Sequence, residues 1–385
     1  MEHAQGLKIA CLTGGTGFRH VAQELTRYTQ RSSHIINVSD SGRSTRQLRL
    51  FFKMPAVGDL RSRLIDLADR RSPGYHEITA LLNHRLQDNA EANPMEQTTE
   101  LQSIIDESHT LVQAINASGS APRGFLDIIL THLTGFERAR RKAEAVIGSN
   151  FDLGKGSIGN FFLAGAYLNY RRNLETAIFL YKVLANVQGE VVPATTDNIH
   201  LAAQLEDGEV IVGQHLITKK GSPSPISGLF YLDREDPAGM RISPRANPHA
   251  VAALLDAEVL VFSMGSFFTS ILSTLHLLGI AEAVRQSPAL KVFIANPVED
   301  RETQGLTAGQ MAMRLLEILR SFDPHPSRVD GDYLNLVITG NLVGTPGSDI
   351  SGLGRKTKVE QMPLDDRGYY IPERLAEMLI EEKIA

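Results

Sequence analysis

The beginning of the chain constrains the fold more than any other part, because it has the pattern of a strand, a turn, a helix and a second strand. An apolar run from Leu7 to Leu12 ends at the glycine turn Thr13 to Gly17, and apolar residues at helical spacing follow from Phe18 to Tyr28. A second apolar run spans Ile35 to Val38. A β-α-β unit of this kind normally makes a parallel pair of strands with a right-handed crossover. We therefore expect an α/β fold.

The alternation of strands and helices continues through the rest of the chain. From about Arg70 to Ile147 the sequence predicts only helices, with a polar surface loop at 87–99. The expected architecture is a single domain over residues 1–385, with a mostly parallel sheet, helices on both of its faces and a helical insertion at about 70–150. Apolar runs predict further strands at 187–193, 199–205, 210–212, 259–263, 291–295 and 333–338, of which 333–338 is the last.

Composition limits the compartment and the partners. The net charge is −5 and no sustained basic stretch occurs, so the sequence argues against nucleic acid as a partner. Cys11 is the single cysteine and cannot form an internal disulfide, which fits a reducing compartment. We expect no secretory signal, because Met1 to Lys8 is short and mixed in charge, and Gly265 and Ser266 interrupt the most apolar stretch, Val259 to Ile280. We expect a cytoplasmic protein without a membrane partner, and a homo-oligomer is left open.

The residues Gly14, Gly15, Thr16 and Gly17 form a turn that suits a phosphate group. Glycine lets the backbone turn tightly and lets a phosphate approach, and the helix that follows offers unpaired N–H groups. The turn lacks the Gly-Lys-Ser/Thr end of a P-loop, and His20 stands where a dinucleotide fingerprint has its third glycine. The sequence therefore predicts a phosphate-binding turn, and a purely structural tight turn is the alternative.

Two aspartates are the candidate catalytic carboxylates. Asp40 ends the second predicted strand, ahead of Ser41 and Gly42, where an acid can hold ribose hydroxyls or ligate Mg²⁺. Asp59 precedes a predicted helix, and capping of that helix alone would explain it. Arg61 lies close by, and arginine pairs well with phosphate. The alternatives are a turn-forming aspartate and solvated helix faces.

Further small polar residues begin predicted helices or follow predicted strands. Ser157 and Asn160 open one helix, Gly265 and Ser266 open another, and Asn296 follows a strand. Because ligands of open α/β sheets bind at the carboxyl ends of the strands, we expect these residues to share one site with the glycine turn. The alternatives are close helix packing and an ordinary turn. The twelve histidines show no metal-binding spacing and no Gly-x-Ser-x-Gly elbow occurs, so the sequence predicts neither a zinc site nor a serine hydrolase.

Several motifs occur in a fixed order along the chain. They are Thr13 to Gly17, Val38 to Ser44, Pro55 to Arg61, Gly156 to Asn160, Asn186 to Thr195, Gly265 to Ile271 and Asn296 to Thr303. Together they resemble the 2-phospho-L-lactate transferase and gluconeogenesis-factor family, whose members are called CofD-like and YvcK-like. The resemblance runs from about residue 7 to residue 310.

This resemblance implies a Rossmann-like core with a nucleotide-derived ligand. The transferases of the family move a 2-phospho-lactyl group from a guanosine diphosphate-linked donor to a deazaflavin alcohol, with Mg²⁺. Its regulators bind UDP-sugars and influence carbon metabolism and cell-wall synthesis, and the motifs at 186–195 and 265–271 resemble theirs more closely. Two positions depart from the family: Asp40-Ser41 replaces a pair of aspartates, and Ser263 to Ser266 replaces a Gly-Pro-Gly-Ser sequence.

Three hypotheses follow from the residues and the resemblance. The first is a transferase-like enzyme in which an acceptor hydroxyl attacks a diphosphate phosphorus. Gly15 and Gly17 would cradle phosphate, Asp40 and Asp59 would hold Mg²⁺ or act as the base, and Arg61 would offset developing charge. The second is a non-catalytic sensor that binds a sugar nucleotide in the same pocket. The third is an interaction module whose glycine loops are structural.

Overall fold

The structure is a computed structural model of the chain, and it describes residues 6–88, 94–220, 225–298, 302–303, 305–325, 329–340 and 357–384. The chain forms two compact units, one from residues 1–39 and 189–385 and the other from residues 40–188. Each unit is described by itself. The expectation of a single domain over 1–385 with a helical insertion at about 70–150 stays a prediction.

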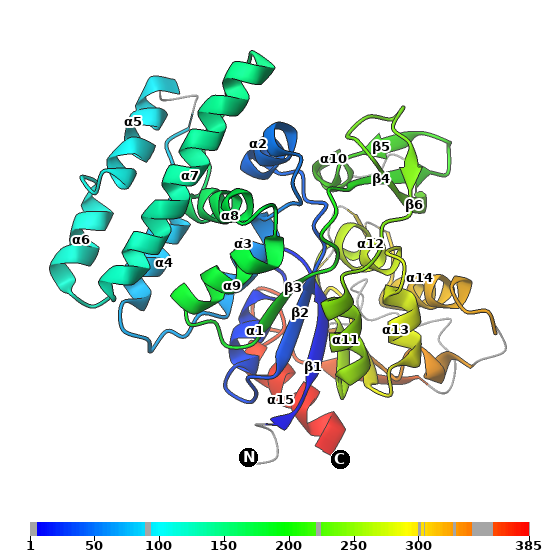
Figure 1. Ribbon diagram of the computed structural model, residues 1–385. Helices are drawn as coiled ribbons and strands as arrows, with labels where there is room; N and C mark the ends of the chain where they lie inside the picture. Colours follow the sequence, from blue (N-terminus) through cyan, green and yellow to red (C-terminus); the bar gives the residue numbers. More distant parts are fainter. Residues whose placement is uncertain are drawn as a thin grey trace. The chain divides into compact units, whose positions relative to one another are not determined.

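The first unit is built on a seven-stranded sheet in which every strand pairs in parallel with its neighbours (Figure 1). The strand order is β11-β10-β9-β8-β1-β2-β3, so the chain proceeds outward to one side of β1 and then returns to its other side. This is the order of a doubly wound fold, and it confirms the predicted mostly parallel sheet. The strands are β1 (Ile9–Thr13), β2 (Ser32–Ile36), β3 (Glu190–Pro193), β8 (Val259–Phe262), β9 (Leu290–Ile294), β10 (Leu336–Gly340) and β11 (Lys358–Met362).

Helices cover both faces of this sheet, as the sequence predicts. The helices α1 (Arg19–Leu25) and α15 (Pro372–Ile384) pack against each other on one face. The main apolar core lies on the other face, where sheet residues such as Leu12 and Phe262 pack with apolar residues of the covering helices. These helices are α11 (Pro248–Asp256), the π-helix η2 (Phe267–Leu272), α12 (Ser273–Leu275), α13 (Ile280–Gln286) and α14 (Ala308–Ser321).

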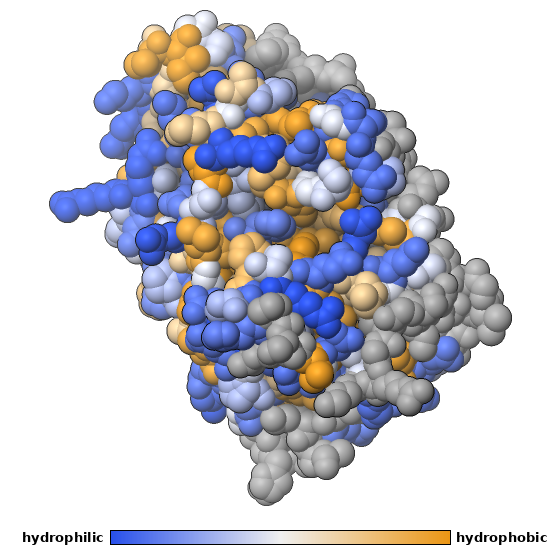
Figure 2. All heavy atoms as spheres, turned by 90° about the vertical axis from the view of Figure 1, so that its right-hand side faces the viewer, coloured by the Kyte–Doolittle hydropathy of each residue, from blue (hydrophilic) through white to orange (hydrophobic). Residues whose placement is uncertain are grey.

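A second, antiparallel sheet lies between β3 and β8 in the sequence. Its order is β5-β4-β6-β7, formed by β4 (His200–Leu205), β5 (Val210–Val212), β6 (Ile226–Leu232) and β7 (Arg241–Ile242), with α10 (Gln214–Lys220) after β5. The predicted turn at Asp207-Gly208 joins β4 to β5. Figure 2 shows the side of the molecule that carries this sheet and α14. On this side hydrophobic side chains are interspersed with hydrophilic ones and surrounded by them.

The second unit is helical. Its helices are α2 (Arg43–Phe52), α3 (Gly58–Asp66), α4 (Tyr75–Asn83), α5 (Pro94–Ile105), α6 (Thr110–Ser118), α7 (Arg123–Ile147), α8 (Ile158–Asn169) and α9 (Leu174–Leu184). The long helix α7 packs along α8, and its Phe136 ring stacks on Phe161 with the ring centroids 4.6 Å apart. The described part of 70–147 contains helices and no strand, in agreement with the sequence.

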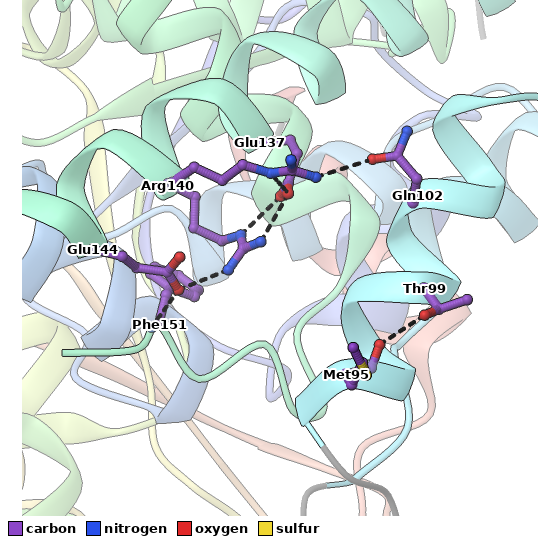
Figure 3. A network of polar contacts seen from close by, with 8 residues as sticks. Met95, Thr99, Gln102, Glu137, Arg140, Glu144 and Phe151 are labelled. Carbon is purple, nitrogen blue, oxygen red and sulfur yellow. Dashed lines mark hydrogen bonds and ion pairs between the residues drawn. The ribbon is translucent and has the colours of Figure 1, made fainter.

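A buried ion network fixes the second half of α7 (Figure 3). Arg140 donates to both carboxylate oxygens of Glu137 at 2.7 and 2.8 Å and to Glu144 at 2.7 Å. The same Glu144 oxygen accepts the backbone N–H of Phe151, which ties the chain after α7 back to the helix. Burial raises the pKa of Glu137, but the hydrogen bonds and charges of Arg140 and Arg141 outweigh it, so the net pKa is lowered.

Five details of the predicted elements are wrong. The strand at 333–338 is not the last, because the polar segment Lys358–Met362 forms β11 on the sheet edge. The strand β6 was not expected, and the loop predicted at 87–99 gives way to α5 from Pro94, with 89–93 outside the described residues. Asp59 is not a helix cap, since α3 begins at Gly58 and Val57 is its capping residue. Asp40 lies beyond the end of β2 rather than on it.

Two simpler expectations can be compared directly with the structure. Cys11 is fully buried in β1, where a small apolar side chain fits. The apolar stretch from Val259 to Ile280 forms β8, a turn and the π-helix, as expected. Among the described residues, every helix is too short or too polar to span a membrane.

We predict that Glu137→Gln lowers the free energy of unfolding by roughly 2 kcal/mol at neutral pH, because it removes charge-assisted hydrogen bonds from buried Arg140. A lowered folded-state pKa stabilises the fold above the ordinary glutamate pKa of about 4.3, and this contribution disappears as the pH falls through the folded value. Urea unfolding of the variant should therefore depend less on pH in the acid range than that of the parent chain. Asp127→Asn, at an exposed position of the same helix, is the control. Equal acid dependence in all three proteins would contradict the prediction.

Candidate functional site

A pocket of about 660 Å³ opens at the carboxyl edge of the parallel sheet in the first unit. Its walls come from the segments that follow β1, β8 and β9, three strands that are neighbours in the sheet. The strand order reverses between β1 and β8, and this is where crevices for ligands form in doubly wound sheets. Gly14, Gly15, Thr16, Gly17, Gly265, Ser266 and Asn296, all predicted as site residues, line this pocket.

The glycine turn after β1 forms the first wall. Gly15 has φ of +37°, a left-handed conformation that glycine adopts without strain. A Cβ atom on Gly17 would lie 3.0 Å from the backbone oxygen of Met264 and 3.1 Å from the Cα of Gly265, so the turn touches the loop after β8 closely. Thr16 and Gly17 are exposed to solvent. The turn therefore presents backbone to the pocket, with little side chain in the way.

The loop after β8 forms the second wall, and Asn296 holds it in place. The Oδ1 atom of Asn296 accepts the N–H of Gly265 at 2.8 Å, and its Nδ2 donates to the Gly265 carbonyl at 2.8 Å. Gly265 has φ of +153°, and a Cβ atom there would meet nothing within 4 Å. Both ends of the Asn296 amide thus hold the backbone of one residue, Gly265, in the wall. The sequence predicts that Asn296 belongs to the ligand site, and its contact with a ligand stays a prediction.

The predicted helix start at Gly265 and Ser266 already holds an acidic side chain. Glu302, which is buried, accepts the N–H of Thr269 at 3.1 Å and the hydroxyls of Thr269 and Thr218 at 2.6 Å each. Thr269 lies in the first turn of the π-helix, where an anion would otherwise be expected to bind. Gly265 and Ser266 line the pocket, but the positive end of their helix is matched by a carboxylate of the protein.

A third wall was not expected from the sequence. It is a turn ahead of α15 that contributes Asp365, Arg367, Tyr369 and Tyr370 to the pocket. Asp365 Oδ1 accepts the N–H groups of Tyr369 and Arg367 at 2.9 Å each, and these hydrogen bonds hold the pKa of Asp365 below its usual range. Tyr370 donates to the carbonyl of Ala295 at 2.8 Å, whereas Tyr369 is 52% exposed. The sequence Asp366-Arg367-Gly368 indicates a turn, but it gives no sign that the turn lines a pocket.

The remaining predicted residues lie in the second unit. Asp40 Oδ1 accepts the N–H of Gly42 at 2.9 Å, which folds the segment ahead of α2 into a turn. A Cβ atom on Gly58 would lie 2.9 Å from Asp40 Oδ2 and 2.8 Å from Thr45 Oγ1. Two oxygen donors therefore converge on the bare backbone of Gly58, at the start of α3. Ser41 lies between Asp40 and Gly42 in this turn and is buried. Asp59 is half-buried in the first turn of α3.

The start of α8 adds a buried amide. Ser157 caps this helix by accepting the N–H of Asn160, as its predicted position at the helix start implies. Asn160 donates from Nδ2 to the hydroxyl of Ser44 at 3.2 Å, and its buried Oδ1 has no hydrogen-bond partner among the described residues. Arg61 is buried and donates to Asn83 Oδ1 at 2.8 Å and to Ser62 Oγ at 3.2 Å.

The predicted site residues thus form two groups, one in each unit. The first group shares the pocket at the sheet edge, and the second gathers around the starts of α2, α3 and α8. The expectation that both groups act on one ligand stays a prediction, as does the role of each residue.

We predict that Asn296→Ala lowers the free energy of unfolding by about 1–3 kcal/mol, because the N–H and carbonyl of Gly265 lose their partner. Asn296→Asp should recover only part of the loss, since a carboxylate accepts from the N–H but repels the carbonyl. Val298→Ala, at an exposed position of the same pocket, is the control. Thermal unfolding of the four proteins tests this. An unchanged melting temperature for Asn296→Ala would show that the two hydrogen bonds between Asn296 and Gly265, which we call the Asn296 clamp, do not stabilise the fold.

The chain is similar in sequence to bacterial proteins that are named gluconeogenesis factors. A protein from Aquifex aeolicus, provisionally named a gluconeogenesis factor, is 25% identical over 307 residues, covering 78% of this chain and 71% of its own. The gluconeogenesis factor of Halalkalibacterium halodurans is 26% identical over 305 residues, covering 79% and 71%. This chain spans about half the length of relatives from Nostoc sp. and Deinococcus radiodurans.

The fold is shared with a solved structure. A protein of the UPF0052 family from Bacillus halodurans superimposes with a TM-score of 0.68 at 20% identity, over 97% of this chain and 98% of that chain. The profile of the family described as 2-phospho-L-lactate transferase CofD matches residues 9–345. That match covers the glycine turn, the Asp40 turn and the Asn296 clamp, and the chain therefore belongs to the CofD family.

Proposed function

We propose that the chain binds a nucleotide diphosphate-linked ligand and transfers a phosphorus-containing group from it to an acceptor hydroxyl. The observation that carries this proposal is the pocket of about 660 Å³ at the point where the strand order reverses, with a bare glycine turn as one wall. A volume of this size suits a ligand of nucleotide dimensions. Family membership supports the same class of ligand.

The pocket residues suggest how such a ligand would lie. The phosphates would rest on the turn from Gly14 to Gly17, which lines the pocket and carries no side chain bulkier than that of Thr16, and its backbone N–H groups would donate to them. Arg19 also lines the pocket and carries positive charge, whereas the charge of Arg367 is paired with Asp365 at 3.2 Å. The exposed ring of Tyr369 offers a flat apolar surface on which a base can stack. The ligand would therefore be recognised through its phosphates and its base.

The residues around Gly58 fit Mg²⁺. Asp40 Oδ2 and Thr45 Oγ1 are hard oxygen donors on the same side of a glycine whose Cβ would fill the space beside them. Mg²⁺ prefers one or two protein oxygens and takes its remaining ligands from phosphates and water. When bound, the ion would neutralise charge on the transferred phosphoryl group. Asp59, in the first turn of the neighbouring helix, is the second candidate carboxylate.

The chemistry asked of the protein residues is modest. The acceptor oxygen forms a bond to the distal phosphorus, the bond from that phosphorus to the bridging oxygen breaks, and a nucleoside monophosphate leaves. A carboxylate, Asp40 or Asp59, would take the hydroxyl proton. Arg61 is proposed to offset developing charge, although two of its hydrogen bonds go to Asn83 and Ser62. Positioning and charge would supply most of the rate enhancement.

A second candidate is a non-catalytic sensor that binds a UDP-sugar in the same pocket. Two observations favour it: the relatives are named gluconeogenesis factors, and one oxygen of the single Asp40 carboxylate is committed to the N–H of Gly42. A sensor needs the pocket and a conformational response, but it needs neither metal nor base.

We predict that a nucleotide diphosphate-linked compound raises the melting temperature of the chain, because a ligand that binds only the folded state stabilises it. The test is a thermal-shift panel of GDP, GTP, UDP-glucose, UDP-N-acetylglucosamine and a deazaflavin, each with and without Mg²⁺. A Mg²⁺-dependent shift with a guanosine nucleotide or a deazaflavin supports the transferase. A metal-independent shift with a UDP-sugar supports the sensor, and no shift with any compound leaves the interaction module.

We further predict that Asp40→Asn removes the Mg²⁺-dependent part of ligand binding and at least 100-fold of any turnover, on the scale of a lost acid–base catalyst. Asparagine keeps an acceptor for the N–H of Gly42, so the turn itself should survive. Asp127→Asn, at an exposed position of α7, is the matched control. Turnover at the parent rate in Asp40→Asn would remove Asp40 from the list of metal or base residues.

A further inference from the structure

Three side chains of a metal-binding type meet in the helical unit, and the proposed function uses none of the three. His84 follows α4, Glu100 lies in α5 and His109 precedes α6. One donor atom from each of the three lies within 4.8 Å of the other two. All three side chains are half-buried, so the cluster is sheltered and still open to water.

The contacts of Glu100 hold it in the orientation of a metal ligand. Its Oε1 lies 2.8 Å from His84 Nε2, and its Oε2 accepts the backbone N–H of Gln87 at 3.1 Å. Metal-binding carboxylates are commonly held in this way by a hydrogen bond from outside the ligand set. The ring of His109 stands beside that of His84, with the centroids 5.0 Å apart.

We propose that His84, Glu100 and His109 form a binding site for Zn²⁺ or a similar divalent transition-metal ion. Two imidazoles with one carboxylate are a donor set that suits zinc, whereas Mg²⁺ and Ca²⁺ select oxygen ligands. Three protein ligands leave a fourth position to water. This inference does not depend on the proposed function, since it concerns other residues and another metal.

The geometry requires only a small adjustment. A tetrahedral zinc ion with ligands at about 2.1 Å places its donor atoms roughly 3.4 Å apart. The three donors are within 4.8 Å of one another before any ion is present. A rotation of the half-buried His109 ring can close the difference. Burial and the neighbouring His84 lower the pKa of His109, although Glu100 opposes them, which favours the neutral ring that a metal needs.

Metal binding would have a specific consequence for α6. His109 is the N-cap of this helix, and its Nδ1 accepts the N–H of Leu111 at 3.2 Å. If the metal binds Nδ1, it displaces that N–H directly. If it binds Nε2, the ring proton moves to Nδ1, which then no longer accepts. Either way the N–H of Leu111 loses its acceptor, so hydrogen exchange at Leu111 reports occupancy of the site.

The test is titration of the full chain, freed of metal by a chelator, with ZnCl₂ and separately with MgCl₂, followed by calorimetry. We expect one strong Zn²⁺ site and no Mg²⁺ binding that depends on these three residues. His84→Gln and Glu100→Gln should each weaken the Zn²⁺ site at least tenfold, and the double variant should abolish it. Glutamine at position 100 retains an acceptor for the N–H of Gln87. His325→Gln, at an exposed histidine of the other unit, should leave the affinity unchanged.

Two further readouts separate a lost site from a damaged fold. In chelator each variant should still give a cooperative melting curve, whereas Zn²⁺ should raise the melting temperature of the parent chain and of His325→Gln but not that of the double variant. Zn²⁺ should also speed hydrogen exchange at Leu111 in the parent chain. The proposal is overturned if the parent chain takes up no Zn²⁺, or if the double variant, folded by its melting curve, binds Zn²⁺ as tightly as the parent.

Discussion

The constraint on which the candidate site depends is the reversal of strand order between β1 and β8. In a parallel sheet the carboxyl ends of all strands lie along one edge. Each crossover helix packs on one of the two faces of the sheet. Because the chain runs outward from β1 in one direction and resumes at β8 in the other, the segments after these two strands diverge. The pocket lies where they diverge. Its position therefore follows from topology, before any particular side chain is considered.

Backbone contacts give this pocket its shape. The glycine turn approaches the loop after β8 so closely that a Cβ on Gly17 would have to displace it. Asn296, which follows the next strand, β9, holds the N–H and the carbonyl of Gly265 through the two ends of its amide. These contacts couple three neighbouring strand ends. A wall made of peptide groups can offer N–H donors to a phosphate at fixed positions, which costs the protein little reorganisation when the ligand binds.

The parts of this architecture that the sequence predicts are those buried on both faces. The central strands β1, β8 and β9 are continuous apolar runs, and their ends carry the glycines and polar residues that mark a site. The edge strand β11 escapes prediction because its residues are mostly polar and half-exposed. Asp365 to Tyr370 escape it as well, because a turn sequence carries no sign of what it will face. Likewise His84, Glu100 and His109 have no recognisable spacing, since tertiary packing of three helices brings them together.

The two ends of the pocket also differ in charge. A helix start is the usual place for an anion, and the sequence offers two such places, after β1 and after β8. The second holds the buried carboxylate of Glu302, which accepts the N–H of Thr269 and carries its own negative charge. A phosphate placed there would meet repulsion in a region of low dielectric, where an unpaired like charge is costly. The glycine turn after β1 has no acidic residue from Thr13 to Val21, and Arg19 follows it. Under the proposed function, the phosphates of the ligand would therefore lie on the β1 side and its uncharged part on the β8 side.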